Sequence, residues 1–164
     1  MTSPEKRYSE LFKEMYDLCE QQGWGDPFSY AVSREIAIAN ELGHQKASTY
    51  SGADGIDEEG ECEYKSTIGK NINGAYNGIS VQPTWEEQVK YLTKEKIAKY
   101  KNHYIARFEN GVIVECYKLK GWKVLDLLLP KLKKSYENTL SKKDPRLGAS
   151  LSKKEIRLYG EKII

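Results

Sequence analysis

The sequence contains no long apolar run. A membrane-spanning helix needs about 18 or more consecutive apolar residues, and the 164 residues of the chain include no such stretch. The start of the chain, from Met1 to Lys6, also lacks the apolar core of a secretory signal peptide. We therefore expect a cytoplasmic protein with no membrane partner.

Cysteine and histidine are scarce, which argues against several kinds of site. The three cysteines, Cys19, Cys62 and Cys116, are widely spaced, so neither a disulfide framework nor a zinc cluster is indicated. The two histidines, His44 and His103, lie far apart in the sequence and are more simply structural residues than metal ligands. Glycine patterns of the P-loop and Rossmann types are missing as well. We expect reduced, buried thiols and no nucleotide cofactor.

Charged residues are abundant, and they are unevenly distributed. Residues 1–64 carry 5 basic and 14 acidic side chains, whereas residues 65–164 carry 21 basic and 10 acidic ones, so the net charge of +2 conceals two opposite halves. A basic half suits a polyanion such as DNA, and an acidic half suits a cation. On charge alone, solvated lysines on helix surfaces are the preferred explanation, because lysine-rich helices are common and the acids are interspersed. Charge therefore supports a nucleic-acid partner without establishing one.

Length and periodicity predict one domain over residues 1–164, built from several helices. Residues 5–22 form an amphipathic pattern, and we expect that helix to pack on the core. A second helix should end at Gly43, and a third should span residues 84–101 behind a capping box. A fourth helical pattern is centred on Pro130, which should distort or interrupt it.

Two β-hairpins are also predicted. They cover residues 50–67 and residues 103–117, and in the second one Asn110-Gly111 favours the type I′ turn that matches strand twist. Residues 69–79 are rich in glycine and asparagine and are predicted to form a loop. A short strand followed by a helix capped by Ser152 should close the chain.

The first hairpin carries acids and a lysine in a pattern that suits metal-dependent chemistry. Glu63 and Lys65 face the same side of a strand, whereas Tyr64 faces the other. The polar stretch over residues 57–60 suits a tight turn that brings Asp54 alongside Glu63. Adjacent carboxylates repel one another unless a hard cation neutralises them, so we expect Mg²⁺, with Mn²⁺ as a substitute. A lysine beside such a cation can stabilise charge on a phosphate.

This arrangement resembles the PD-(D/E)xK nuclease superfamily, in which an acid near the start of one strand is followed by Glu-x-Lys or Asp-x-Lys on the next. The matching residues are Asp54, Glu63 and Lys65. Glu35 lies where the superfamily usually carries a further acid on the preceding helix. Gly52-Ala53 stands where the name-giving proline would be, and that proline is often missing within the superfamily.

The resemblance implies a fold and a mechanism. The fold is α/β (α+β), with a restriction-endonuclease-like central mixed sheet of about four or five strands flanked by helices. The activity is Mg²⁺-dependent hydrolysis of DNA phosphodiester bonds, in which Asp54, Glu63 and the Tyr64 carbonyl bind the metal and Lys65 activates or positions water. Glu35 is a further ligand through water or a partner that orients Lys65. The small size is most similar to a type II restriction endonuclease, which acts on double-stranded DNA as a homodimer.

Two segments are candidates for contacting DNA. The glycine- and asparagine-rich segment offers Lys70, Asn71 and Asn73, since asparagine can pair with adenine and lysine with phosphate or guanine. Lys153 and Lys154 oppose the dipole of the last helix, which a phosphate backbone would offset. A plain connector and ordinary surface lysines explain the same residues.

Two other functions are compatible with the sequence. A Holliday-junction resolvase or a structure-selective repair or phage nuclease would share the fold and size. A non-catalytic DNA-binding module, in which the acidic hairpin is only a solvated turn, belongs to a different class. The sequence does not specify a recognition site.

Overall fold

The computed structural model describes residues 3–48, 52–139 and 141–164. Residues 50 and 51, where the first predicted hairpin begins, lie outside the described residues. The strands are β1 (Gln45–Lys46), β2 (Gly55–Asp57), β3 (Gly60–Thr67), β4 (Gly74–Ser80), β5 (Asn102–Glu109), β6 (Val112–Lys120), β7 (Arg146–Leu151) and β8 (Glu161–Lys162). The helices are α1 (Pro4–Gln22), α2 (Val32–Leu42), α3 (Trp85–Tyr91) with a π-helical continuation η1 (Leu92–Lys96), α4 (Gly121–Thr139) and α5 (Lys153–Tyr159).

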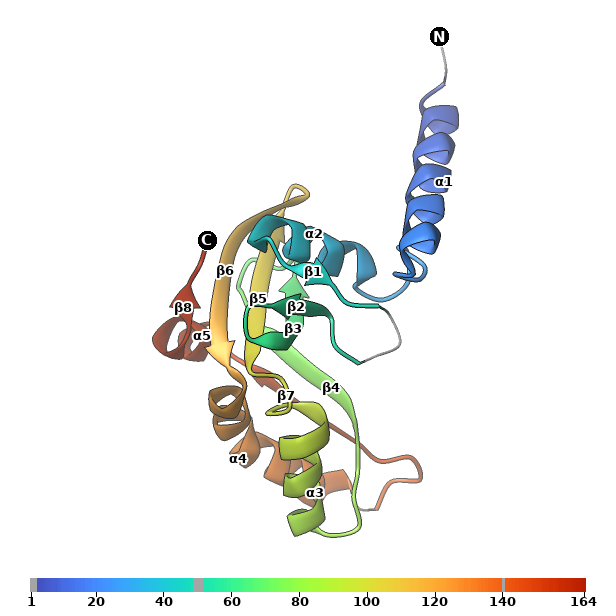
Figure 1. The fold of residues 1–164 in the computed structure, drawn as a ribbon. Helices are drawn as coiled ribbons and strands as arrows, with labels where there is room; N and C mark the ends of the chain where they lie inside the picture. Colours follow the sequence, from blue (N-terminus) through green and yellow to red (C-terminus); the bar gives the residue numbers. More distant parts are fainter. Residues whose placement is uncertain (1–2, 49–51, 140) are drawn as a thin grey trace.

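The strands form a mixed sheet of six strands and a second sheet of two (Figure 1). The larger sheet has the order β1-β2-β3-β5-β6-β8, and the smaller one pairs β4 with β7. The expected α/β (α+β) class is confirmed, although the central sheet has more strands than expected. Both predicted hairpins form, as β2-β3 and β5-β6, and Asn110 and Gly111 have the positive φ angles of a type I′ turn, 52° and 80°.

The central sheet is covered on both faces. Strand β3 runs antiparallel to β2 and parallel to β5, with Glu63 beside His103 and Tyr64 beside Tyr104. Side chains alternate along a strand, so Tyr64 and Tyr104 share one face and Glu63 and Lys65 lie on the other. The tyrosine face packs on α2. On the opposite face, a larger core unites residues from β4, β7 and the helices α4 and α5.

The predicted loop over residues 69–79 is wrong for its second half. Residues from Gly74 onward form β4, in which Gly74, Tyr76 and Ile79 are buried against β7 and the core. A Cβ at Gly74 would lie 2.8 Å from Ile105 Cδ1, so a larger residue there would require the buried Ile105 side chain to shift. A break in register between Tyr76 and Ile79 hides the two-residue period that would have revealed a strand.

Two helix predictions need correction. The third helix begins with the expected Thr84–Glu87 capping box but ends at Lys96, after a π-helical turn, instead of continuing to residue 101. Beyond that end, the backbone of Tyr100 packs directly against Gly121. A Cβ added at Gly121 would lie 1.9 Å from the Tyr100 carbonyl oxygen, so this packing requires glycine. Pro130 does not interrupt α4. It is exposed, so water can reach the carbonyl that its missing N–H leaves free.

Helix α1 does not pack on the core as expected. It projects from the body of the molecule (Figure 1), and of its residues only Cys19, close to its C-terminal end, is buried. Ser3 caps its first turn, Pro4 opens it and Gly23 ends it in the left-handed conformation. Local signals thus define this helix without a packing partner.

Candidate functional site

The predicted acids and lysine meet at the end of the β2-β3 hairpin. The backbone N–H of Tyr64 donates a hydrogen bond of 2.8 Å to Asp54 Oδ2, which fixes the aspartate against β3. On the neighbouring residues, Lys65 Nζ forms an ion pair with Glu63 Oε1. The structure therefore places Asp54 directly beside the Glu63-Tyr64-Lys65 segment, as the hairpin pattern predicted.

Glu35 joins this cluster with a partner that the sequence did not suggest. Its Oε2 lies 3.3 Å from Lys46 Nζ, and only 4% of the Lys46 side chain is exposed. Lys65 forms its ion pair with Glu63, whereas the charge of Glu35 acts on Lys65 by raising its pKa, so the role of Glu35 as a partner that orients Lys65 stays a prediction. We define the carboxylate cluster as Glu35, Asp54 and Glu63 with the lysines Lys46 and Lys65.

The Tyr64 main chain contributes to the same place. The N–H and C=O of one residue point to the same edge of a strand. Since the Tyr64 N–H points toward Asp54, its carbonyl oxygen points toward that side too, away from β5. The carbonyl is thus oriented as the resemblance implies for a metal ligand.

Burial and mutual repulsion shift the acids of the cluster in one direction. Burial is the main reason that the pKa of Glu63 rises to about 7, and Asp54 raises it further while Lys65 opposes the change. Burial also raises the pKa of Asp54 and of Glu35, the latter with a contribution from Asp54. Burial alone would lower the pKa of Lys65, but Glu63, Asp54 and Glu35 together raise it. The cluster has more carboxylates than ammonium groups, so a cation would relieve it.

Sequence reasoning missed the support that Lys65 receives from Tyr76 of the second sheet and from His103 of β5. Lys65 Nζ lies 5.1 Å from the centre of the Tyr76 ring. The Tyr76 hydroxyl is 2.9 Å from His103 Nδ1, and His103 Nε2 is 2.8 Å from the Ile97 carbonyl oxygen. A carbonyl only accepts, so Nε2 carries the hydrogen and Nδ1 accepts from Tyr76. Burial lowers the pKa of His103 to about 4, which keeps the ring neutral.

Only part of this support was accessible from sequence. Tyr76 lies in the segment that the sequence predicts as a loop. The contact of His103 with the Ile97 carbonyl depends on where the third helix ends, which the sequence predicts at residue 101 and the structure has at Lys96. Lys46 lies a few residues before residues 49–51, which the structure does not describe, and no sequence motif identifies it as part of a site. Its burial next to Glu35 is evident only in three dimensions.

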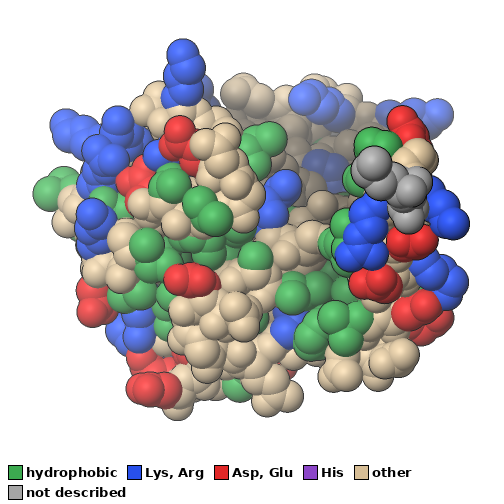
Figure 2. Space-filling model, turned by 90° about the horizontal axis from the view of Figure 1, so that it is seen from above, with side chains coloured by type: hydrophobic (Ala, Val, Ile, Leu, Met, Phe, Trp, Pro, Cys, Tyr) green, Lys and Arg blue, Asp and Glu red, His purple; other side chains and the backbone are tan. Residues whose placement is uncertain are grey.

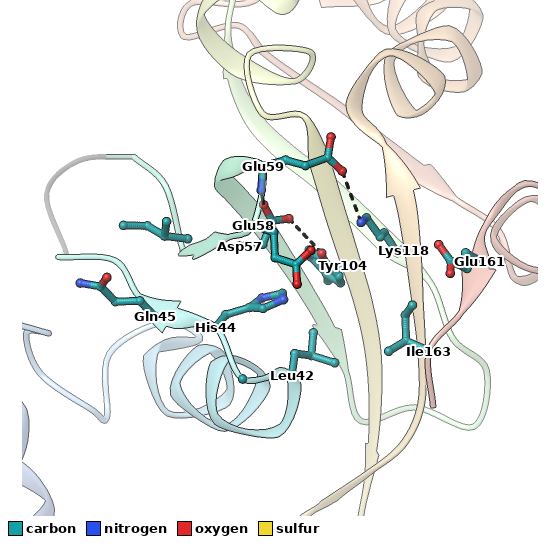
Figure 3. Close-up of a pocket in the computed structure, with 12 residues that line it drawn as sticks. Leu42, His44, Gln45, Asp57, Glu58, Glu59, Tyr104, Lys118, Glu161 and Ile163 are labelled. Atoms are coloured by element: carbon teal, nitrogen blue, oxygen red, sulfur yellow. Dashed lines mark hydrogen bonds and ion pairs between the residues drawn. The ribbon is translucent and has the colours of Figure 1, made fainter.

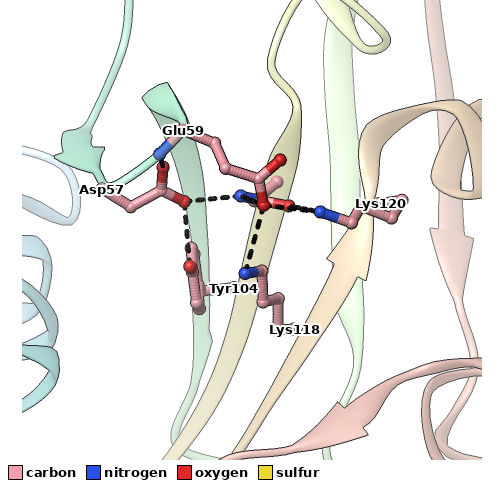
Figure 4. Close-up of polar contacts among 6 residues, drawn as sticks. Asp57, Glu59, Tyr104, Lys118 and Lys120 are labelled. Atoms are coloured by element: carbon pink, nitrogen blue, oxygen red, sulfur yellow. Dashed lines mark hydrogen bonds and ion pairs between the residues drawn. The ribbon is translucent and has the colours of Figure 1, made fainter.

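The acids of the turn serve a different purpose from those of the carboxylate cluster. Asp57 Oδ2 accepts hydrogen bonds from Asn102 (2.7 Å) and the Tyr104 hydroxyl (2.9 Å), and Asp57 Oδ1 accepts one from the Glu59 N–H (Figure 4). Glu59 Oε1 binds Lys120 at 2.6 Å, and these contacts lower the pKa of Glu59 to about 2. Asp57 and Glu59, which we call the turn acids, anchor the hairpin to β5 and β6.

A pocket of about 530 Å³ opens beside the turn acids (Figure 3). Its lining includes the polar residues His44, Tyr104, Lys118, Glu58 and Glu161. Apolar residues of the lining include Leu42 of α2 and Ile163, which follows β8. His44 Nδ1 is 2.9 Å from the Tyr64 hydroxyl, which places the histidine on the tyrosine face of the sheet. The pocket and the carboxylate cluster therefore lie on opposite faces, and the predicted residues do not line the pocket.

The donor set of the carboxylate cluster fits a hard divalent cation. Among the described residues, no group of three or more His, Cys, Asp or Glu side chains is arranged to hold a metal ion. Mg²⁺ does not need such a cage, because it commonly binds through one or two carboxylates and keeps several waters. Asp54, Glu63 and the Tyr64 carbonyl match that requirement, and their excess negative charge favours it.

The candidate DNA-contacting residues come together at the surface. Lys153 Nζ donates a hydrogen bond of 3.1 Å to Asn71 Oδ1, joining segments that lie far apart in the sequence. Lys70, Asn73 and Lys154 are exposed around this contact or next to it in the chain. The pairing of Gly74 with Leu151 explains the proximity, because it aligns the start of β4 with the end of β7. Strand β4 continues from here to Tyr76 beneath Lys65.

No family model matches the chain, and no curated protein matches it significantly. Within the described residues, none of the helices has the length and apolar character that crossing a bilayer requires. The assignment of function therefore depends on the chemistry of the site itself.

Proposed function

We propose that this protein is a Mg²⁺-dependent endonuclease that hydrolyses phosphodiester bonds of double-stranded DNA, acting as a sequence-specific restriction endonuclease. The observation that carries the proposal is the carboxylate cluster. It combines Asp54 and Glu63, held side by side on one hairpin, with Lys65 in contact with Glu63. The cluster sets three partly buried acids beside two lysines, which leaves an excess of one carboxylate.

The residues of the cluster divide into two roles. Asp54, Glu63 and the Tyr64 carbonyl would hold Mg²⁺, which supplies Lewis-acid activation of the phosphate when bound. Lys65, an ammonium group held by Glu63 and resting over Tyr76, donates hydrogen bonds to the attacking water or to phosphate oxygens. Glu35 and Lys46 form an ion pair, and the charge of Lys46 also acts on Asp54.

The surface beside the cluster suits a polyanion. The contact between Lys153 and Asn71 places a cation and an amide on one exposed site, and β4 connects that site to Tyr76 under Lys65. Lysine contacts to phosphate supply sequence-independent affinity, whereas asparagine can read a base edge. The free, buried thiols of the three cysteines agree with the cytoplasmic location that forms part of this proposal.

The direct test is digestion of a long unmodified duplex DNA by the purified protein in Mg²⁺ or EDTA. The Lys65→Ala variant tests the cluster, and Lys120→Ala is the matched control, because Lys120 also pairs with a glutamate of the same hairpin but lies outside the cluster. Discrete fragments that require Mg²⁺ and Lys65, and that persist in Lys120→Ala, support the proposal.

Other outcomes select the alternatives. Cleavage of four-way junctions or flaps with intact linear duplex indicates a Holliday-junction resolvase or a structure-selective nuclease. DNA binding without cleavage of any substrate, together with unchanged Mn²⁺ binding in Asp54→Asn, indicates a non-catalytic DNA-binding module and refutes the endonuclease.

A further inference from the structure

Tyr100, which precedes β5, is a buried residue beside the carboxylate cluster, and no sequence motif identifies it. Its ring packs on Ala47 and Ala53. Ala47 directly follows Lys46 in the chain, and Ala53 directly precedes Asp54. The ring of Tyr100 therefore lies against the two segments that carry these members of the cluster.

The hydroxyl of Tyr100 lies close to the acids. A Cβ added at Gly52, two residues before Asp54, would lie 3.2 Å from the hydroxyl oxygen. Burial, and after it the charges of Glu63 and Asp54, raises the pKa of Tyr100 to about 12. At neutral pH the hydroxyl therefore keeps its proton and can donate a hydrogen bond.

This hydroxyl is a donor that the fold itself does not use. Only 4% of Tyr100 is exposed, and among the residues that the structure describes none accepts a hydrogen bond from its hydroxyl. The two ammonium groups of the cluster are engaged, because Lys65 pairs with Glu63 and Lys46 pairs with Glu35. A polar group in so buried a residue usually has a partner, since it has lost most of its contact with water.

A ligand can reach the Tyr100 hydroxyl. Within the described part of the chain, every side-chain nitrogen or oxygen that is fully buried has a hydrogen-bond partner. The Tyr100 oxygen has none, so it belongs to the small part of the residue that remains accessible. The missing partner is thus an acceptor on a molecule that binds at the carboxylate cluster.

A phosphate oxygen is the acceptor that suits this position. The carboxylates repel an anion, so a phosphate can enter only together with a cation that offsets their charge. Asp54, Glu63 and the Tyr64 carbonyl offer the oxygen ligands that Mg²⁺ prefers, and Mg²⁺ sites in proteins commonly include phosphate oxygens of the substrate. An uncharged hydroxyl beside such a site adds a directed hydrogen bond to the anion.

Directed contacts of this kind matter because surface charge is mixed elsewhere on the molecule. Figure 2, seen from above, shows acidic and basic side chains side by side on that face. A surface of mixed charge attracts a polyanion less than a uniformly basic one. The position of a phosphate should therefore depend on individual donors such as Tyr100.

We propose that Tyr100 is a further catalytic residue, whose hydroxyl donates a hydrogen bond to an oxygen of the phosphate bound at the carboxylate cluster. The inference rests on the proposed nuclease function, because it takes the same cluster as the place where the phosphate binds. It adds a residue that the hairpin motif does not include, and it gives the phosphate a neutral donor in addition to Lys65.

The first test measures binding and does not require cleavage. Electron paramagnetic resonance follows Mn²⁺ binding to the full chain, and the ³¹P line width follows binding of inorganic phosphate to the Mn²⁺-loaded protein. Tyr100→Phe removes the hydroxyl and keeps the ring. We expect unchanged Mn²⁺ affinity and phosphate affinity about tenfold weaker, as for the loss of a hydrogen bond to a charged group. Tyr16→Phe removes an exposed hydroxyl of α1 and should match the wild type in both measurements.

The outcomes separate this inference from the proposed function. A wild type that binds no Mn²⁺ refutes both. Mn²⁺ binding that Asp54→Asn abolishes, with phosphate affinity equal in wild type and Tyr100→Phe, leaves the metal site intact and overturns the role of Tyr100. Absence of phosphate binding to the Mn²⁺-loaded wild type overturns it as well. Loss of Mn²⁺ binding in Tyr100→Phe also overturns it, because the hydroxyl would then maintain the metal site instead of contacting phosphate.

Cleavage supplies a second readout. A contact that strengthens as charge develops on the phosphate affects kcat more than KM. On a DNA that the wild type cleaves, Tyr100→Phe should therefore lower kcat by about 10²-fold and raise KM by less. Thermal unfolding followed by circular dichroism checks that the variant keeps its fold. A stable variant with unchanged kcat would contradict the proposal.

Discussion

The two sets of acids on the β2-β3 hairpin differ in what surrounds them. The turn acids Asp57 and Glu59 are surrounded by donors, and the pKa of Glu59 falls to about 2. A few residues away, Glu63 is partly buried beside another carboxylate, and its pKa rises to about 7. The same residue types on one hairpin are thus stabilised as anions at the turn and destabilised as anions at the strand. Carboxylates that the fold stabilises as anions anchor the hairpin, whereas carboxylates whose pKa is raised by burial and by a neighbouring carboxylate are the candidates for chemistry.

The strongest test of this contrast is catalytic. Asp54→Asn should lower Mg²⁺-dependent DNA cleavage by about 10²–10³-fold, the usual cost of removing one charge-stabilising group from an active site. Glu59→Gln should leave cleavage essentially unchanged, because Glu59 contacts Lys120 and Asn102 instead of the carboxylate cluster. Rates are measured on the mapped DNA substrate under single-turnover conditions. Equal losses of cleavage rate in Asp54→Asn and Glu59→Gln would contradict the distinction between the carboxylate cluster and the turn acids.

Stability should show the reverse order. Asp57→Asn weakens the charge-assisted hydrogen bonds from Asn102 and Tyr104 and should reduce the free energy of unfolding by about 1–3 kcal/mol. Asp54→Asn removes one of the repelling anions of the carboxylate cluster, so it should reduce the free energy of unfolding by less than Asp57→Asn does. Urea denaturation measures both, with Glu58→Gln as the exposed neighbouring control. The contrast fails if Asp54→Asn proves the more destabilising change.

The contribution of Asp57 should also depend on pH. Burial alone would raise the pKa of Asp57, but hydrogen bonds from Asn102, the Glu59 N–H and Tyr104 lower it below its ordinary value of 3.8. A carboxylate with a lowered pKa stabilises the fold above the pKa of the unfolded chain and loses that contribution as the pH falls through the folded value. The stability difference between wild type and Asp57→Asn should therefore be constant near neutrality and shrink below about pH 4. A difference that grows toward acid pH would contradict this explanation.

The smallest effect is expected at the surface. Lys153→Ala removes one candidate phosphate contact, so DNA affinity should fall a few-fold and the slope of log affinity against log salt should decrease by about one. Fluorescence anisotropy in Ca²⁺, which prevents cleavage, measures both quantities. Lys142→Ala, an exposed lysine of the turn after α4, is the control. An unchanged salt slope in Lys153→Ala would place the DNA elsewhere.

Local signals determined how much of this fold could be predicted. The Asn110-Gly111 turn, the capping boxes at Thr84 and Ser152 and the Asp54, Glu63 and Lys65 arrangement depend on nearby residues, and the structure has them where the sequence placed them. Strand β4 was missed because its pairing partner, β7, lies more than sixty residues further along the chain.

Long-range packing likewise decided what the sequence could not show about the site. Lys46 and Glu35 meet only when α2 packs beside β1, and Tyr76 reaches Lys65 only when the second sheet covers the first. The outward position of α1 was missed for a related reason. An amphipathic pattern reports that a helix has an apolar face, and it does not report which surface covers that face.

The parallel pairing of β3 with β5 has a consequence for folding. Each hairpin can close through a short turn, but joining β3 to β5 requires the chain between them, including β4 and α3, to be folded back first. Contacts between distant segments form slowly compared with hairpins. The Lys65-Tyr76 contact should therefore appear late during refolding, after the β5-β6 hairpin. A newly made chain would acquire the support that Tyr76 and His103 give to Lys65 only when β4, β5 and β7 are in place.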